Sequence, residues 1–288
     1  MGLGWVEVGI GHEPRGNLSH RPEANPPELT GPKRSGPAGA HVGRRGSATE
    51  LLGSPSVEEV DRLGGYEEQA AAAVRRFGHL LAGRHIGAGE AEEIETTLRR
   101  MGALIDAAGV RAKQHEHARS PRYTAFVRTG QPVATPDGEA IEFDRSSIVG
   151  GMANPFGTEA RHRRDGDEAV TTVTFGPAFE GPPGRVHGGV VAMVLDEATA
   201  TLMPMLGRFA FTGSVSLRLV APAPLGVEVT FRSHLRGHDG RKLFVRCVGE
   251  GPDGVFVEAD ATYIEIDPAV ALPWLVEARR AYLEAPAG

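Results

Sequence analysis

Apolar and polar residues alternate over four stretches in the C-terminal half of the chain. The stretches are 209–220, 227–237, 241–250 and 255–266, and clusters of Gly, Pro and Asp separate them. Alternation at period two between such turn residues is typical of antiparallel strands. We therefore expect a meander of four strands, with one more strand upstream at Glu168–Phe175.

The N-terminal half carries a helical periodicity instead. Its apolar residues recur at spacings of three and four, at Ala70, Val74, Phe77 and Leu81, then at Ile94, Leu98, Met101, Ile105 and Ala108. This spacing predicts a pair of amphipathic helices over 57–110, whose apolar faces should pack on a sheet or on another subunit. The stretch 121–166 shows no clear period, and we expect it to be irregular.

A further helix is expected to be buried. The run 190–203 is apolar on most of its helical circumference and is closed by Pro204, which predicts nearly four turns of helix in the core. A last helix is expected over 268–283. One buried helix, preceded by a strand and followed by antiparallel strands, favours an α+β fold in which a curved sheet wraps a single central helix.

Composition separates the N-terminus from the rest of the chain. Residues 1–50 contain 16 Gly or Pro and few large aliphatic side chains. Too little apolar surface is available there to offset the entropy of ordering, so we expect a disordered tail over 1–56. The chain then divides into this tail, a helical extension over 57–120, and a main domain over 121–288 that includes the C-terminal helix.

Charge and cysteine content exclude several classes of protein. The 288 residues include 31 Lys and Arg against 37 Asp and Glu, a net charge of -6, so no basic field favours nucleic acid. The single cysteine, Cys247, excludes an internal disulfide framework. Because neither a signal peptide nor a membrane-spanning run is seen, we expect a cytoplasmic protein with no membrane partner.

The most informative stretch is Gly181–Ala198, with the sequence GPPGRVHGGVVAMVLDEA. It places Asp196 inside the expected buried helix, where a charged side chain is unfavourable unless it has hydrogen-bond partners or a catalytic use. Two interpretations of Asp196 stay open, a structural hydrogen bond to a loop and a group that acts on a substrate. Glu197 lies about 100° further around the helix and could point elsewhere.

Gly188 and Gly189 stand where the loop passes into this helix. They would let a ligand approach the free amides of the helix start, where the helix dipole favours a developing oxyanion. Alternatively, they only permit a tight turn. The nine residues from His187 to Asp196 rise about 13 Å, so the helix start and Asp196 of one chain cannot both touch the same acyl carbon. A composite site across a two-fold dimer would solve this.

The His-Gly-Gly motif, followed by Asp at the ninth position after the His and by the strand TGSVSLRLVAPAPLG, resembles a known family. It is similar to the hot-dog-fold acyl-CoA thioesterases, in the phenylacetyl-CoA thioesterase-like branch of the 4-hydroxybenzoyl-CoA thioesterase superfamily. The resemblance covers roughly 150–266. It implies a five- or six-stranded antiparallel sheet around one long helix, with two subunits joined into a continuous sheet and sites at their interface.

The same resemblance implies a role for each residue of the motif. Asp196 would activate water or attack the thioester carbonyl, and the Gly188 N–H would polarise that carbonyl from the other subunit. His187 would shape the site at the loop corner. Ser214 would help to orient the water, although it can equally be a serine on the polar face of a strand. Gly181 stands where some relatives carry Asn or Gln, which leaves one contact unaccounted for.

Coenzyme A would enter as part of the substrate, and we expect no separate cofactor. Its phosphates favour basic and backbone contacts. The candidates are Gly189, Arg185, Arg161, Arg163 and Arg164. Charged runs are more often solvated surface. The cluster His115-Glu116-His117 resembles a metal site only superficially, because alternate residues of a helix point apart, and no metal is expected.

The sequence therefore favours an acyl-CoA thioesterase that acts as a homodimer or a dimer of dimers. The alternative is a hot-dog protein that binds acyl-CoA or assembles with partners without catalysis, and the missing polar side chain at Gly181 supports it. A hydratase acting on enoyl-CoA would need an Asp and a His within one local motif on the helix. The segment VVAMVLDEATA has no such pair.

Overall fold

A computed structural model describes residues 6–9, 57–107 and 120–284 of the chain. Its helices are α1 (Val57–Ala82), α2 (Ala88–Asp106), α4 (Pro121–Thr129), α5 (Gly188–Ala200), α6 (Leu202–Met205) and α7 (Pro268–Glu284), with a 3-10 turn, η2, at Pro177–Phe179. Its strands are β1 (Val6–Gly9), β2 (Arg161–Asp165), β3 (Glu168–Thr174), β4 (Ala210–Leu219), β5 (Glu228–Asp239), β6 (Lys242–Gly251) and β7 (Gly254–Glu265).

The strands form one antiparallel sheet in the order β1-β4-β7-β6-β5-β3-β2. The meander predicted from the sequence is confirmed for β5, β6 and β7. It is wrong for β4, which pairs with β7 and not with β5. The reason lies in the connection after β4, which crosses from the β4 edge of the sheet towards the β3 edge. There the Gly226 N–H donates to the carbonyl of Phe175, the residue that follows β3.

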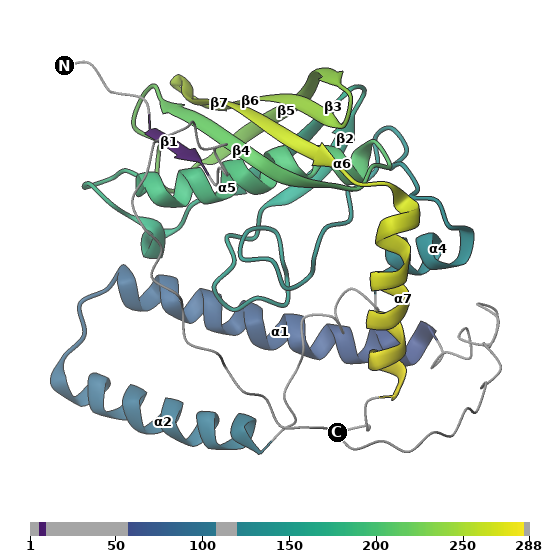
Figure 1. The fold of residues 1–288 in the computed structure, drawn as a ribbon. Helices are drawn as coiled ribbons and strands as arrows, with labels where there is room; N and C mark the ends of the chain where they lie inside the picture. Colours follow the sequence, from purple (N-terminus) through teal and green to yellow (C-terminus); the bar gives the residue numbers. More distant parts are fainter. Residues whose placement is uncertain (1–5, 10–56, 108–119, 285–288) are drawn as a thin grey trace, which may run out of the picture.

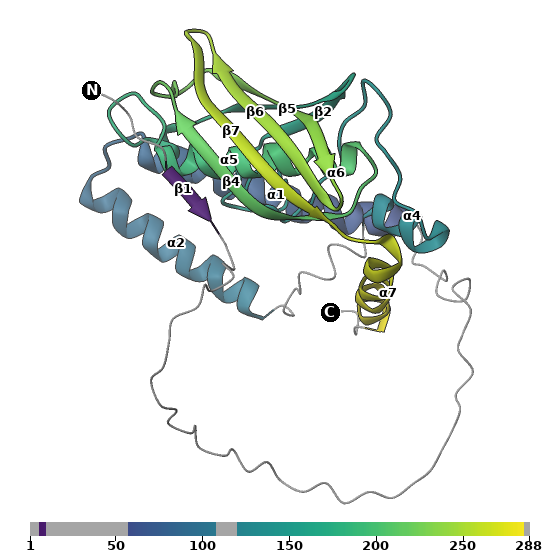
Figure 2. The same cartoon turned by 45° about the horizontal axis from the view of Figure 1, so that its top comes forward.

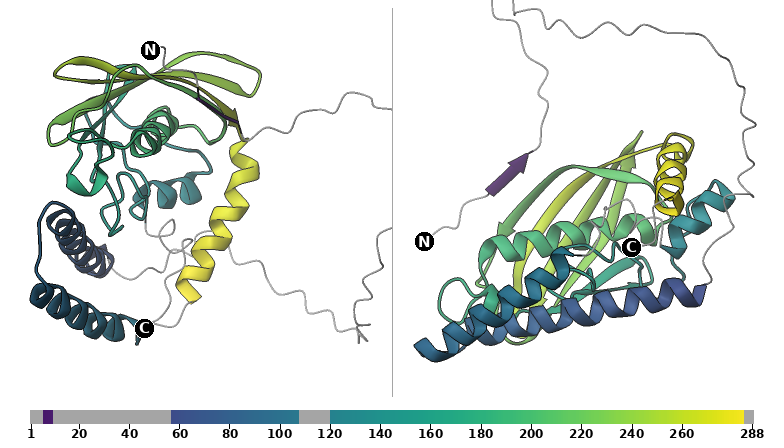
Figure 3. Two further views of the ribbon diagram at one scale, coloured as in Figure 1. Left: turned by 90° about the vertical axis from the view of Figure 1, so that its left-hand side faces the viewer. Right: turned by 90° about the horizontal axis from the view of Figure 1, so that it is seen from below.

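The sheet curves around α5. Figure 1 and Figure 2 show α5 lying along one face of the sheet. In the end-on view of Figure 3, left, the sheet arches over α5, and α1 and α2 lie on the side of α5 away from the sheet. The α+β architecture predicted from the sequence, a sheet wrapped around one central helix, is confirmed.

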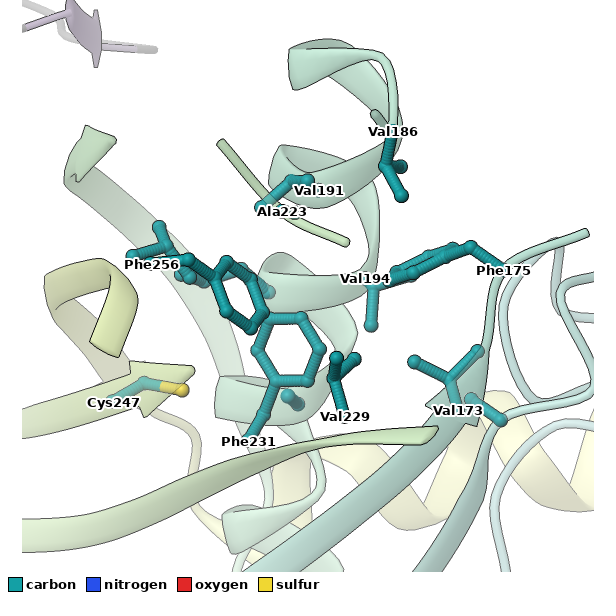
Figure 4. Close-up of a cluster of buried hydrophobic side chains, with 14 of the residues drawn as sticks. Val173, Phe175, Val186, Val191, Val194, Ala223, Val229, Phe231, Cys247 and Phe256 are labelled. Carbon is teal, nitrogen blue, oxygen red and sulfur yellow. The ribbon is translucent and has the colours of Figure 1, made fainter. Parts of the chain in front are cut away.

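The space between α5 and the sheet is filled by apolar side chains from both (Figure 4). Helix α5 contributes Val191, Val194 and Leu195, which are almost fully buried. Phe231 of β5 meets Phe256 of β7 edge to face, with ring centroids 5.5 Å apart. Alternate residues of a strand point to opposite faces, so this core needs the period-two pattern seen in the sequence.

Replacing Phe231 by alanine is expected to lower the free energy of unfolding by about 3–5 kcal/mol, because a fully buried ring leaves a cavity when it is truncated. Phe231 is 0% exposed, whereas Phe211 on β4 is 59% exposed. Phe211→Ala is therefore the matched control, with little expected effect. Urea denaturation of both variants measures the difference, and equal losses would contradict this description of the core.

Two elements occur in the stretch 121–166, where the sequence predicted irregular structure. Strand β2 is one, and α4 is the other. Ser120 caps α4 by accepting a hydrogen bond from the Tyr123 N–H, Pro121 opens the helix, and Gly130 ends it at φ 70°. These are ordinary helix start and stop signals. The prediction was wrong because α4 is too short to show a hydrophobic period.

The helix pair predicted over 57–110 is present as α1 and α2. The helix predicted over 190–203 begins two residues earlier, at Gly188, and ends at Ala200, so Pro204 lies inside the short α6. Val6–Gly9, within the expected tail, forms β1 and pairs with Ser214–Leu217 of β4. The rest of 1–56 and the cluster at 115–117 lie outside the described residues.

Candidate functional site

The loop before α5 places His187 and Gly188 at the start of the helix. The His187 N–H donates to the Phe179 carbonyl at 2.9 Å. The His187 side chain caps α5, because its Nδ1 accepts the Gly189 N–H at 3.0 Å. Gly189 therefore offers no free amide to a ligand. Gly188 is the first helical residue, and an N–H at this position has no acceptor within the helix.

Gly181 lies against His187 within this loop. A Cβ at Gly181 would come within 2.8 Å of the His187 Cα, closer than real side chains approach. The Gly181 N–H donates to the Arg185 carbonyl at 2.9 Å, which folds the loop back on itself. An Asn or Gln would not fit this backbone. Glycine at 181 therefore suits the close approach of this part of the loop to His187.

Asp196 is not buried in the single chain, contrary to the expectation from the sequence. Its side chain is exposed, and no described residue donates a hydrogen bond to its carboxylate. Partial burial among its neighbours nevertheless raises the pKa of Asp196, and the negative charge of Glu197 raises it further. A carboxylate with a raised pKa binds a proton more readily, which suits a general base.

Glu197 is the buried carboxylate of α5. It is 6% exposed, and it accepts hydrogen bonds from the Gly150 N–H at 2.7 Å and from the Ser147 hydroxyl. His162 of β2, also buried, places its Nε2 3.0 Å from the Glu197 carboxylate. We refer to Ser147, Gly150, His162, Thr171 and Glu197 as the Glu197 cluster.

Neither Glu197 nor His162 was assigned a role from the sequence. A usable signal was present for His162, because alternate residues of the strand RHRRD point to opposite faces. With Arg161 and Arg163 exposed, His162 between them must point inwards, and it does. For Glu197 the signal was only its position beside Asp196 on a helix that had to bury most of its surface.

Ser214 lies away from α5. Val215, Leu217 and Leu219 of β4 pack against the core, so Ser214 belongs to the outer face of the sheet. It is exposed and lines a shallow pocket there with Ser216, Arg236 and Thr262, among others. The structure thus does not bring Ser214 and Asp196 of one chain together, which favours the interpretation of Ser214 as a serine on the polar face.

The four candidate arginines differ in their surroundings. Arg163 pairs with Asp165 at 3.3 Å, and Arg164 donates to the carbonyls of Thr135 and Gly166 at 2.8 Å each. These two side chains hold local structure. Arg161 and Arg185 are exposed, and Arg185 lies in the loop that leads to α5. The position of Arg185 therefore suits a phosphate contact near the helix start best.

Gly188 begins α5, and Asp196 lies more than two turns further along the same helix. Eight residues separate them, and at 1.5 Å per residue the distance along the helix axis is about 12 Å. The amide of Gly188 and the carboxylate of Asp196 in one chain therefore do not reach the same small acyl carbon.

Among the described residues no group of three His, Cys, Asp or Glu could hold a metal ion.

Comparison with known proteins shows partial matches in sequence. Acyl-coenzyme A thioesterase THEM4 of Mus musculus is 37% identical over 101 residues, which are 34% of this chain and 44% of that protein. THEM4 of Bos taurus is 30% identical over 140 residues, 46% of this chain and 58% of that protein. The chain spans about half the length of these curated relatives. No family model matches.

A solved structure decides the fold. It is a thioesterase superfamily protein that covers 69% of this chain and 90% of its own length, with a TM-score of 0.55 and 22% identity. The chain has the hot-dog fold. The resemblance predicted from the His-Gly-Gly and Asp motif is thereby confirmed at the level of the fold. Within the described part of this hot-dog protein, no helix is long and apolar enough to cross a membrane.

Proposed function

We propose that this hot-dog protein hydrolyses acyl-CoA thioesters to a free acid and coenzyme A. The observation that carries the proposal is the arrangement of α5, which begins with the amide of Gly188 and presents Asp196 at the surface with a raised pKa. An acyl transfer needs both a hydrogen-bond donor for the oxyanion and a base or nucleophile. The similarity to acyl-coenzyme A thioesterases supports the same chemistry here.

In this proposal each group acts on a defined atom of the thioester. The Gly188 N–H donates to the carbonyl oxygen, and the positive end of the α5 dipole stabilises the charge that develops there. The Asp196 carboxylate takes a proton from water as the water attacks the carbonyl carbon, or attacks that carbon itself. The thiolate of coenzyme A leaves without strong acid assistance, because its pKa is low.

The proposed site needs two copies of the chain. Gly188 and Asp196 lie about 12 Å apart along α5, so the amide of one copy would act with the carboxylate of another. The surface position of Asp196 supports this, since an exposed carboxylate is available to a substrate held by a second subunit. Arg185, beside the helix start, would contact the phosphates of coenzyme A.

Thiol release from a panel of short, medium, long and aryl acyl-CoA esters tests the proposed activity. We expect turnover of at least one class of ester by the folded protein. The signal from the protein itself should be small, because Cys247 is fully buried and burial raises the pKa of its thiol to about 12. Tight binding of the esters without hydrolysis would overturn the proposal and favour the non-catalytic acyl-CoA-binding alternative.

A further inference from the structure

The Glu197 cluster forms a continuous chain of hydrogen bonds that ends at Glu197, the residue that follows Asp196 on α5. Thr171 of β3 lies 2.9 Å from His162 Nδ1, and His162 Nε2 lies 3.0 Å from Glu197. A carboxylate can only accept, so the Nε2–H of His162 donates to it, while Nδ1 on the other side of the ring is hydrogen-bonded to the Thr171 hydroxyl. Every member of this chain is at most 9% exposed, apart from Gly150, whose backbone N–H donates to the same carboxylate.

The cluster fixes α5 to a loop that α1 holds from the other side. This loop, 145–159, runs between α5 and α1 (Figure 1). Ser147 and Gly150 bind Glu197 on one side of the loop. On the other side, Arg75 of α1, itself buried, donates to the carbonyls of Met152 and Asn154 at 2.9 and 2.6 Å.

Two ion pairs also hold this loop against α1. Arg75 pairs with Glu159 at 2.9 Å, and Arg145 pairs with Glu68 of α1 at 2.8 Å. The backbone packs closely against the Glu197 carboxylate, because a Cβ on Gly150 would lie 2.4 Å from His162 Nε2 and 2.9 Å from Glu197. The Glu197 side chain is therefore held at a fixed place against the loop.

We propose that Glu197, held by His162 and the 145–159 loop, is a positioning residue for Asp196 in the hydrolysis proposed above. The two carboxylates are consecutive on α5 and point about 100° apart. Fixing Glu197 inside the protein therefore fixes the direction in which Asp196 points outside it. The inference rests on the proposed function only for its effect on turnover, since the effect of Glu197 on Asp196 itself is measurable without a substrate.

Glu197 also acts on Asp196 through its charge. After burial, the charge of Glu197 is what raises the pKa of Asp196. Among the described residues, Tyr263 of β7 is the other titratable group that interacts with Asp196, and burial raises the pKa of its hydroxyl. The Tyr263 hydroxyl stays neutral over the range in which carboxylates titrate, so it does not compete with Glu197 as a source of charge.

The variant Glu197→Gln separates charge from shape. The Gln side-chain oxygen can accept the Gly150 and His162 protons, and its NH2 can donate to the Ser147 oxygen, so the hydrogen bonds survive while the charge is lost. We expect the titration midpoint of the Asp196 carboxyl, followed by carbon-detected NMR and assigned with Asp196→Asn, to move to lower pH. The acid limb of the kcat/KM profile should move with it.

Glu168→Gln is the matched control. Glu168 is a carboxylate of the same domain that pairs with Arg232 at 3.0 Å between β3 and β5, outside the Glu197 cluster. The Glu168→Gln variant should leave the titration midpoint of Asp196 unchanged. An unchanged midpoint in Glu197→Gln would overturn the charge effect of Glu197 on Asp196, whether or not the protein is an enzyme. A shifted midpoint in a protein that hydrolyses no ester would instead overturn the proposed function and leave the effect of Glu197 on Asp196 standing.

A second pair of variants tests the positioning by geometry. His162→Leu removes the donor to Glu197, and His162→Gln keeps a donor near the same place. We expect kcat to fall about tenfold or more in His162→Leu with KM nearly unchanged, because small misplacement of a reacting group is costly. His162→Gln should restore most of kcat. Equal kcat values in the two folded His162 variants would contradict a positioning role for His162 and Glu197.

Discussion

Asp196→Asn is expected to remove thioester turnover, with kcat lowered by about 10²–10⁴-fold, while the protein stays folded. The amide has the same shape as the carboxylate but neither attacks a carbonyl nor takes a proton from water. Side-by-side thiol-release assays and circular dichroism of the two proteins measure this. A retained rate in the folded variant would show that Asp196 is not the group that acts on the thioester.

The same variant has an expected signature in stability. The pKa of Asp196 is raised in the folded protein, so this carboxyl favours folding below its unfolded pKa, and that contribution is lost as the pH rises through its folded pKa. Asp196→Asn should therefore unfold at a higher temperature than the wild type at neutral pH. The advantage should shrink as the pH falls and Asp196 becomes protonated. A variant that is less stable at neutral pH would contradict the assigned direction.

Gly188→Pro is expected to lower kcat by about 10²–10³-fold, because it deletes the one N–H that is proposed to hold the oxyanion. The backbone suits the change. Gly188 is the first residue of α5, where proline fits a helix, and His187 before it has φ -62° and ψ 130°, the extended region that a following proline requires.

Gly188→Ala controls for the added atoms, because alanine keeps the N–H. Its Cβ would meet only the end of the Leu219 side chain, at 3.1 Å, which can shift by a few tenths of an ångström. We expect a much smaller loss of kcat in Gly188→Ala than in Gly188→Pro. Similar losses in both variants would mean that space, and not the hydrogen bond, is what the site needs at Gly188.

Local signals were enough to predict the long strands and α5. The period-two stretches at 209–220 and 255–266 became β4 and β7 with shifts of only one residue at each end. The His-Gly-Gly entry to a helix was also readable, because a capping His and a glycine at the helix start are local features. Strand pairing is different. That β4 pairs with β7 depends on where the 220–227 connection crosses, which no local pattern records.

The sequence could not show which of two consecutive carboxylates is buried. Asp196 and Glu197 have similar chemistry, and each lies on a helix whose apolar residues cover most of its circumference. Burial of Glu197 follows from the 145–159 loop, which brings Ser147 and Gly150 to it from about fifty residues upstream. Only the folded chain brings these donors together, so the sequence directed attention to the exposed carboxylate.

The two ends of the sheet differ in a way that limits how copies of this chain could grow into larger structures. At the β2 end, residues 139–141 run alongside the outer strand, with the Ile141 N–H donating to the His162 carbonyl and the Arg164 N–H to the Glu139 carbonyl. At the opposite end of the sheet the edge strand is β1, which pairs with Ser214–Leu217 of β4. Among the described residues, the outer side of β1 and the outer side of β4 before Ser214 therefore have no strand partner. Two copies that paired along these stretches would each cover the unpaired edge of the other, an arrangement that closes as a pair and does not extend as a fibre.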